Sequence, residues 1–474
     1  MFEYTSHPIH ESAELAIDFL VIGGGLAGVS CALALRRVGH RVVVLEQFTY
    51  SESSKMSHGG IRLPPNVVKI LYKWGLKDAL DAISVESRSF EMDKYETGEV
   101  LGTHVWDEDI FTATGGAFLL CHHADLRQLL YDAAIEAGAK IHSGVKVVSV
   151  DCNACQVTLS SGAKLRADVL VGADGCSGLM SQAVTGKNVF GDASPHCLFY
   201  NTTVPVELMQ RDPALADLCI SKYKSFVWLG HNAGVTGFHL LLQGGKAEFA
   251  LHIWAQPSRY EGEHCTAEVS PKEMRKQLGH CEPRLLKLAT LAKSPARVQV
   301  KIIPPLANWV HPSGRVLIIG EAAHPLPAGS IQSGALAVED SAVLAKLFSH
   351  LRSEDQIPTF LYALQELREG RCASVVKCEQ DNLFFQMMPH GPQQERRDNM
   401  LRKLVAKGRT RLSGAEPFDQ WEQVKALFGY DPEDQADDWW VKWGILRERA
   451  KDRTRDLEER MNSRFPVLAS SHNV

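Results

Sequence analysis

An apolar run followed closely by glycines is the first strong pattern along the chain. Residues 19–22 are apolar throughout, as expected for a strand buried inside a parallel sheet. Residues 26–38 then predict a helix, and residues 41–46 predict a second buried strand. A strand, a glycine-rich turn, a helix and a parallel strand form the basic unit of an α/β fold.

The rest of the chain alternates between this pattern and a different one. Residues 197–254 are apolar at every second position, which predicts antiparallel sheet. Beyond residue 366 the pattern becomes helical, charged and rich in tryptophan. Further pieces of the α/β unit are predicted as buried strands at 165–172 and 315–320 and helices at 123–137 and 334–351.

These pieces predict a Rossmann-like α/β domain that is interrupted by an antiparallel-sheet domain. We expect the dinucleotide-binding domain to be built from two separate parts, with a helical region at the end of the chain. The predicted boundaries are 15–190 and 301–365 for the two parts, 191–300 for the inserted domain and 366–474 for the helical region.

Composition narrows the class of protein. The chain has 474 residues, of which 45% are hydrophobic, and this is enough for more than one sizeable core. The net charge of −5, without a basic run, argues against nucleic acid as a partner. No apolar stretch approaches the ~20 residues that an integral membrane helix needs. Eleven scattered cysteines and the lack of a signal pattern predict a cytoplasmic protein, and the oligomeric state stays open.

Cys152 and Cys155 form a C-x-x-C pattern, but it lies in a stretch that alternates like a β-hairpin. No second pair of metal-binding side chains lies nearby in sequence. We therefore favour a turn with incidental cysteines over a redox or metal site, and we predict no metal.

The glycine turn has the spacing of a dinucleotide site. In Gly23-Gly-Gly25-Leu26-Ala27-Gly28, the first glycine permits the tight turn, Gly25 admits a pyrophosphate and Gly28 allows close helix packing. The free N–H groups of the following helix N-terminus attract phosphate. Glu46 ends the next strand, where a carboxylate accepts hydrogen bonds from a ribose.

Two later motifs indicate which dinucleotide binds. Residues 167–175 read Ala-Asp-Val-Leu-Val-Gly-Ala-Asp-Gly, and residues 320–325 read Gly-Glu-Ala-Ala-His-Pro. In this order after the glycine turn, they resemble the fingerprints of the group A flavoprotein monooxygenases. Residues 390–394 and 428–431 resemble the fungal branch, which includes salicylate-hydroxylase-like and indole-alkaloid monooxygenases.

The resemblance implies an FAD-dependent monooxygenase with NADPH or NADH as co-substrate. Reduced flavin would react with O₂ to give a C4a-hydroperoxide, which would hydroxylate an aromatic small molecule. One alternative is epoxidation of an indole or alkene. Another is that the protein is a flavin dehydrogenase or reductase. Besides the residues of the glycine turn and Glu46, the implied FAD-binding residues are Gly60, Arg62, His123, Val147, Asp174, Glu321, Gln332 and Gly334.

Some positions depart from the family pattern. Glu321 replaces the usual Asp, and its longer side chain still reaches a hydroxyl group. His123 replaces an Arg near the pyrophosphate, so Arg127 or Arg62 would have to compensate. Asn201 follows Tyr200 where relatives that act on phenolates often carry Tyr-Arg. Losing that Arg removes a charged partner for an anionic group, which predicts a neutral or weakly acidic aromatic substrate.

The candidate catalytic residues are less sharply defined by the sequence. Tyr200, Asn201 and His239 lie on the predicted antiparallel sheet, where Tyr200 or His239 could serve as a general base. Pro325 would line the flavin face on which oxygen reacts. Phe199, Trp228, Phe238 and Trp254 could line an aromatic pocket or fill the core. Trp439, Trp440 and Trp443 could touch a membrane, but docking of a helix onto its own domain is favoured.

Overall fold

The computed structural model describes residues 13–52, 59–106, 108–188, 190, 195–242, 245–256, 266–406, 424–446, 449–450 and 453. Residues 1–12, on which the expectation about a missing signal rests in large part, lie outside the described residues.

A five-stranded parallel sheet forms the centre of the α/β unit. Strand β1 pairs with β2 on one side and with β12 on the other, and Leu20 lies opposite both Val43 and Leu170. Residues 19–22 of β1 and all four residues of β12 are apolar or glycine and buried, as the uninterrupted apolar runs predict. The order is β19 (Val316–Ile318), β12 (Val169–Gly172), β1 (Asp18–Ile22), β2 (Arg41–Glu46) and β8 (Lys140–Ser143).

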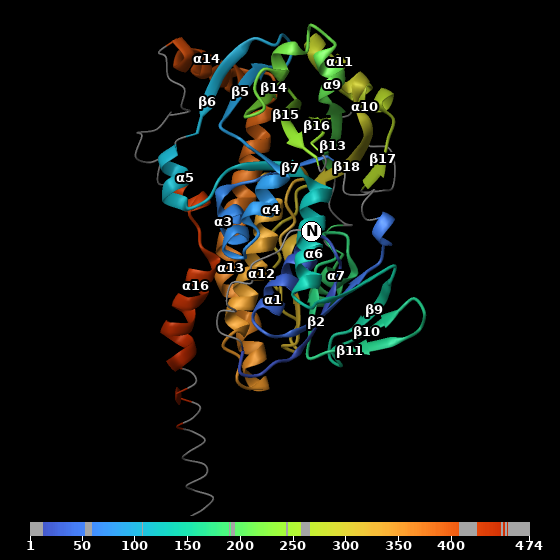
Figure 1. The fold of residues 1–474 in the computed structure, drawn as a ribbon, viewed down its shortest axis with the longest axis vertical. Helices are drawn as coiled ribbons and strands as arrows, with labels where there is room; N and C mark the ends of the chain where they lie inside the picture. The colour runs from blue at the N-terminus through green and yellow to red at the C-terminus, as the bar shows by residue number, and fades with distance from the viewer. Residues whose placement is uncertain are drawn as a thin grey trace, which may run out of the picture.

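Helices pack against this sheet and against one another. Helix α1 (Leu26–Arg37) contacts both α6 (His123–Glu136) and α12 (Ser333–Phe348), as Figure 1 shows. Residues 334–345 of α12 are all buried, which explains why it is apolar on nearly every face. The predicted α/β architecture is therefore confirmed, with helix ends within a few residues of the predicted ones.

The predicted strand at 165–172 is in fact two strands in different sheets. Lys164–Arg166 is β11, which belongs to a small antiparallel sheet with β9 (Val147–Asp151) and β10 (Gln156–Leu159). Cys152 and Cys155 lie in the β9–β10 turn, and both are buried against the main core. The favoured interpretation of the C-x-x-C pattern as a turn agrees with this geometry.

The inserted domain is built on an eight-stranded sheet whose central strands are antiparallel. Strands β5 (Ser89–Lys94) and β6 (Val100–Val105) belong to this sheet, although they fall inside the range predicted for the dinucleotide-binding part. Their membership depends on parallel pairing of β5 with β14, more than 120 residues away, which local periodicity cannot reveal. The sheet order is β17 (Thr266–Glu268), β18 (Lys293–Lys301), β13 (Pro195–Pro205), β16 (Ala247–Ala255), β15 (Ala233–Leu241), β14 (Lys224–Leu229), β5 and β6.

Helices cover one face of the large sheet, and the other face looks toward the α/β unit. The covering elements are α9 (Val206–Gln210), α10 (Pro271–Gln277) and α11 (Pro283–Leu291), which lie at the top of Figure 1. A further three-stranded sheet, with the order β3 (Gly60–Leu63), β7 (Leu119–His122) and β4 (Ser84–Glu86), lies between the two units.

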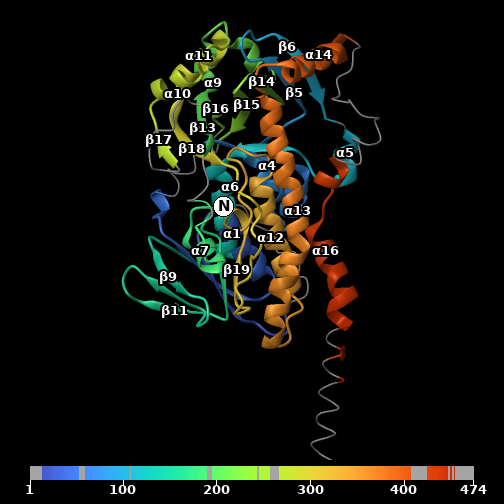
Figure 2. The same ribbon diagram turned by 180° about the vertical axis from the view of Figure 1, so that it is seen from behind.

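Helix α13 (Ile357–Gln386) joins the two units. It packs along α12 and continues as far as β14 and β15 of the large sheet (Figure 2). The boundary predicted between residues 365 and 366 is wrong, because it falls in the middle of this continuous helix. After α14 (Pro392–Ala406), the chain returns to the α/β unit at α16 (Pro432–Trp439).

Two of the three C-terminal tryptophans pack onto the protein itself, which is the interpretation favoured from the sequence. Trp439 and Trp440 are buried and pack on Phe360, whereas Trp443 is exposed. Among the described residues, no helix combines the length and the apolar character needed to cross a membrane. The remaining elements are α3 (Pro65–Lys73), α4 (Lys77–Ala82), α5 (Glu108–Thr114), α7 (Leu179–Thr185) and the short helical turns η1 (Ala216–Cys219), η2 (Gly320–Ala322), η3 (Glu354–Gln356) and η4 (Trp440–Gly444).

Candidate functional site

The glycine turn between β1 and α1 has little room for side chains at its ends but is open in the middle. Gly23 has φ +106°, and a Cβ there would lie 2.4 Å from the carbonyl oxygen of Ala173. A Cβ on Gly28 would lie 1.9 Å from the carbonyl oxygen of Gly23. A Cβ on Gly25 would meet nothing within 4 Å. The open position faces a cavity, which is the arrangement a close-lying ligand requires.

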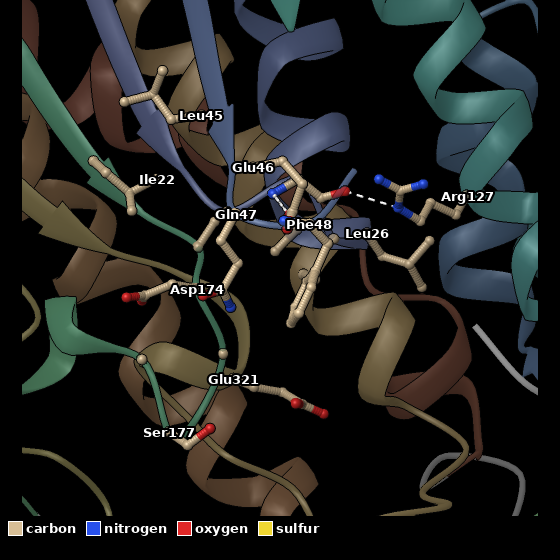
Figure 3. Close-up of a pocket in the computed structure, with 18 of the residues that line it drawn as sticks. Ile22, Leu26, Leu45, Glu46, Gln47, Phe48, Arg127, Asp174, Ser177 and Glu321 are labelled. Atoms are coloured by element: carbon tan, nitrogen blue, oxygen red, sulfur yellow. Dashed lines mark hydrogen bonds between the residues drawn. The ribbon is translucent and has the colours of Figure 1, made fainter. Parts of the chain in front are cut away.

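This first cavity has a volume of about 560 Å³ and runs from the glycine turn to the N-terminus of α12 (Figure 3). The Glu46 carboxylate accepts hydrogen bonds from the N–H groups of Gly24 at 2.7 Å and Phe48 at 2.8 Å. Nε of Arg127 donates to the carbonyl oxygen of Gly24 at 2.9 Å. Together these contacts fix the turn and place a carboxylate and a guanidinium at the wall of the cavity.

Most of the predicted cofactor-binding residues line the first cavity. They are Gly23, Gly25, Leu26, Ala27, Glu46, His123, Val147, Asp174, Glu321 and Gly334. They come from segments separated by up to about 310 positions in the chain, and the fold brings them together at the carboxyl ends of parallel strands, where such folds bind nucleotides.

The charged groups of this cavity are perturbed by burial. Burial raises the pKa of Asp174 to about 6, even though its carboxylate accepts the N–H of Met180. Burial lowers the pKa of His123 to about 4, so its imidazole is neutral at pH 7. Desolvation by the surrounding protein also raises the pKa of Glu321, although its side chain is exposed to the cavity (Figure 3). Nδ1 of His123 and Oδ1 of Asp174 have no hydrogen-bond partner among the described residues, so both can serve a ligand.

Four predicted cofactor-binding residues do not line this cavity. Gly28 lies beneath the turn, and Gly60 packs against Phe238. Gln332 and Arg62 line a second cavity instead, and Arg62 donates a hydrogen bond to the carbonyl oxygen of Gly329. Of the two arginines that could compensate for His123, Arg127 lines the first cavity and Arg62 does not.

The second cavity, of about 410 Å³, lies between the large sheet, α13 and the loop 327–332. Consecutive residues line the two cavities at Ile61 and Arg62 and at Gln332 and Ser333, so the cavities are neighbours. The wall of the second cavity is largely aromatic and aliphatic, with residues that include Phe90, Met92, Trp106, Phe118, Leu120, Trp254, Leu383 and Phe428.

Glu379 is the acidic residue of the second cavity. It lies on α13, and its carboxylate accepts the N–H groups of Gln332 at 3.0 Å and Ile331 at 3.2 Å. The sequence gives no local sign of it, because a single glutamate within a charged helix is usually solvated. Only the approach of α13 to the start of α12 reveals the contact.

Tyr200 and His239, the candidate general bases, do not line either of the two cavities. Tyr200 is fully buried in the cluster beneath α10 and α11. Nε2 of His239 lies 2.8 Å from the carbonyl oxygen of Leu218, to which it donates, on the same helix-covered face. Because side chains alternate along a strand, both point away from the cavities.

Asn201 and Pro325 also lie outside the lining of both cavities. The carboxamide of Asn201 touches the backbone of Gly59, which leads into β3. Pro325 is half-buried beside His324, which is held by Asp340. Of the aromatic candidates, Trp254 lines the second cavity, whereas Trp228 and Phe238 fill the core. Phe199 packs against Trp254.

The geometry defines a class of protein: a dinucleotide-binding oxidoreductase with an apolar chamber at the end of its cofactor channel. Comparison with known sequences gives the family. Residues 16–377 match the family model described as FAD binding domain, and the chain belongs to this family.

Named relatives match over most of their length. The chain is 29% identical over 393 residues to the FAD-dependent monooxygenase OpS4 of Beauveria bassiana, covering 81% of this chain and 89% of that protein. It is 26% identical over 381 residues to hispidin-3-hydroxylase of Neonothopanus nambi, covering 77% and 88%. The chain is therefore an FAD-dependent monooxygenase that uses NAD(P)H and O₂.

Solved structures share the fold. The structure of FqzB superposes with a TM-score of 0.72 at 19% identity, covering 91% of this chain and 94% of that chain. CtdE, in complex with FAD and its substrate 4, has a TM-score of 0.71 at 17% identity, covering 91% and 100%.

Proposed function

We propose that this monooxygenase oxygenates a neutral or weakly acidic aromatic small molecule that binds in the second cavity. The observation that carries the proposal is the composition of that cavity. Aromatic and aliphatic side chains form most of its wall, and its described charged groups, Arg62 and Glu379, each hold the backbone of the loop 327–332.

The first cavity would hold FAD in an extended form. Its pyrophosphate would lie at Gly25 and the N-terminus of α1, and Arg127 supplies the positive charge that neutral His123 lacks. Glu46 would accept the hydroxyl groups of one ribose, and Glu321 would bind the ribityl chain near the start of α12. FAD, when bound and reduced, supplies the activation of O₂.

The protein's contribution to the reaction is to orient the substrate and exclude water. The ring of the substrate would lie among Trp106, Phe118 and Phe428, which stack or meet edge to face. The loop 327–332 separates this chamber from the start of α12, so it sets the distance between substrate and cofactor.

The expected charge of the substrate follows from what lines the chamber. No lysine or histidine is among its described lining residues, and Arg62 faces Glu379. An aromatic carboxylate would have to be desolvated next to Glu379, which is unfavourable. The named relatives include 6-hydroxynicotinate 3-monooxygenase of Pseudomonas fluorescens as well as hispidin-3-hydroxylase, so the family handles both charge types.

The experiment is a turnover screen with the FAD-loaded protein, NADH or NADPH, and ¹⁸O₂. Phenols and indoles should stimulate oxidation of the nicotinamide and gain one ¹⁸O atom, as detected by mass spectrometry. Salicylate should give neither. Coupled hydroxylation of salicylate at rates equal to the best phenol would contradict the proposal. An epoxide or its rearrangement product, rather than a phenol, would identify the epoxidation chemistry.

A further inference from the structure

Glu379 is unusual for a residue in an apolar chamber. Its side chain is only 5% exposed, and it is the only carboxylate among the described residues that line the second cavity. It lies on α13 opposite the loop that leads into α12. Burying a carboxylate costs folding free energy unless its oxygens accept hydrogen bonds. The hydrogen-bond partners of Glu379 therefore indicate its role.

The hydrogen bonds of this carboxylate are incomplete. One oxygen accepts the N–H of Gln332 and the other accepts the N–H of Ile331. The hydroxyl of Ser330 is a third donor to this carboxylate, which has about four lone-pair sites and so retains acceptor capacity. Burial raises the pKa of Glu379, although Arg62, the two N–H groups and the hydroxyl of Ser330 favour its charged form. A further hydrogen-bond donor from the cavity side would stabilise the anion.

The neighbouring charges restrict what that donor can be. Arg62, on β3, is the charged group that faces Glu379, and it already donates to the carbonyl oxygen of Gly329. His252 lies near Arg62 and is neutral, because burial lowers its pKa to about 3. Cys378 is the adjacent residue on α13, and burial raises the pKa of its thiol. None of these supplies a further positive charge to Glu379.

We propose that Glu379 binds the O–H or N–H group of the aromatic substrate and excludes aromatic carboxylates from the second cavity. This inference rests on the proposed function, because it assigns the polar contact of the same substrate. The substrate's donor occupies the remaining acceptor positions of the carboxylate, while the aromatic wall holds the ring. An aromatic carboxylate brings a second negative charge to the same place.

The test measures binding to the FAD-loaded protein by equilibrium dialysis, with three probes of nearly equal size. 2-Naphthol donates a hydrogen bond, 2-methoxynaphthalene does not, and 2-naphthoate carries a negative charge. The wild type should bind 2-naphthol about tenfold more tightly than the ether, as expected for a hydrogen bond to a charged group. Glu379→Gln should weaken 2-naphthol about tenfold and strengthen 2-naphthoate.

Opposite shifts distinguish recognition from a structural role. If Glu379 only holds the loop, Glu379→Gln will change all probes in the same direction, and the inference fails. Asn382→Ala is the control, because Asn382 lines the same cavity without a charge; it should leave the ratio of 2-naphthol to 2-naphthoate affinity unchanged.

The wild type alone gives a second measurement in case the variant does not fold. Protonation of the carboxylate removes its charge, and burial raises its pKa, so the preference for 2-naphthol over the ether should fall as pH decreases from neutral into the acid range. An equal affinity for these two probes at every pH would overturn the role of Glu379 but leave the proposed function standing. Failure of every aromatic probe to bind would overturn both.

Discussion

Asp340 and His324 form a buried ion pair in which Oδ2 of Asp340 lies 2.6 Å from Nε2 of His324. The same carboxylate accepts the N–H of Gly320 at 2.9 Å and Nε of Arg368 at 2.8 Å. It thereby ties α12 to the turn that carries Glu321 into the first cavity. The cofactor channel is thus held by a charge network that lies behind it and does not line it.

Removal of the Asp340 charge should destabilise the fold. Asp340→Asn leaves Arg368 and His324 with one fewer buried partner, and breaking such pairs costs about 3–5 kcal/mol of unfolding free energy. Asp381→Asn removes an exposed carboxylate that pairs with Lys377, and it should cost less than about 0.5 kcal/mol. Denaturant unfolding at fixed FAD concentration measures both. Equal midpoints for the two variants would show that the network contributes little.

The pH dependence of stability follows from His324. Burial disfavours its charged form, but Asp340 outweighs this and raises the pKa of His324 well above its usual value. A raised histidine pKa stabilises the folded state fully below the unfolded pKa of about 6.5, and the benefit is lost as pH rises through the folded pKa. The stability difference between the wild type and His324→Gln should therefore be largest near pH 6 and shrink at alkaline pH. A difference that stays constant from pH 6 to 10 would mean that His324 is neutral in the folded protein.

Gly25→Ala and Gly28→Ala should affect different properties, FAD binding in the first case and the stability of the apoprotein in the second. Gly25 adopts φ −73°, which alanine tolerates, and its new Cβ would point into the first cavity. Gly25→Ala should therefore fold normally but bind FAD at least about tenfold more weakly, a loss of ~1.4 kcal/mol. Gly28→Ala forces a Cβ to 1.9 Å from the backbone of Gly23 and should lower the stability of the apoprotein by about 1–3 kcal/mol or more.

Flavin fluorescence titration and thermal unfolding of the apoprotein separate the two effects. The prediction requires that each glycine affects mainly one of these measurements. If Gly25→Ala bound FAD as tightly as the wild type, the pyrophosphate would not lie at the glycine turn.

An arginine at position 123 should strengthen FAD binding. His123 is neutral at pH 7, so it offers the pyrophosphate no charge, and the cations that line this cavity are Arg127 and Lys146. His123→Arg should lower the Kd for FAD about tenfold at low salt, with the gain reduced at high salt. His123→Gln should change the Kd by less than about threefold, because a neutral group replaces a neutral group. Fluorescence titration at two ionic strengths tests both variants.

The sequence predicts best what is encoded locally. The glycine turn, its flanking strands and Glu46 lie within about 30 residues, so backbone geometry, burial and ribose recognition determine these residue types locally. The family resemblance then supplies Asp174 and Glu321, which the structure brings to the same cavity. Arg62 lines the second cavity, and its position in a strand does not show which of the two cavities it faces.

Contacts between distant segments are what the sequence does not reveal. Glu379 acquires its role only because α13 runs past the start of α12. The face of the sheet on which Tyr200 lies is hidden from the sequence for a related reason. Both faces of the large sheet are covered, so the residues on both faces are apolar or aromatic and the alternation does not tell which face meets the cofactor domain.

Tyr200 and His239 should be dispensable for turnover, since they lie on the helix-covered face of the large sheet. The Tyr200 hydroxyl has no hydrogen-bond partner among the described residues, so Tyr200→Phe should be neutral or slightly stabilising. His239→Gln keeps a donor for the carbonyl oxygen of Leu218 and should retain kcat/KM within about threefold.

Trp254→Phe is the matched comparison from the opposite face of the same sheet. Its indole lines the second cavity and donates to the carbonyl oxygen of Ala328 at 2.9 Å. Loss of that bond frees the loop that separates substrate from cofactor, and kcat/KM should fall about tenfold. Steady-state oxidation of NADPH with the best phenol from the screen measures all variants. A larger loss for Tyr200→Phe than for Trp254→Phe would mean that the substrate binds on the other side of the sheet.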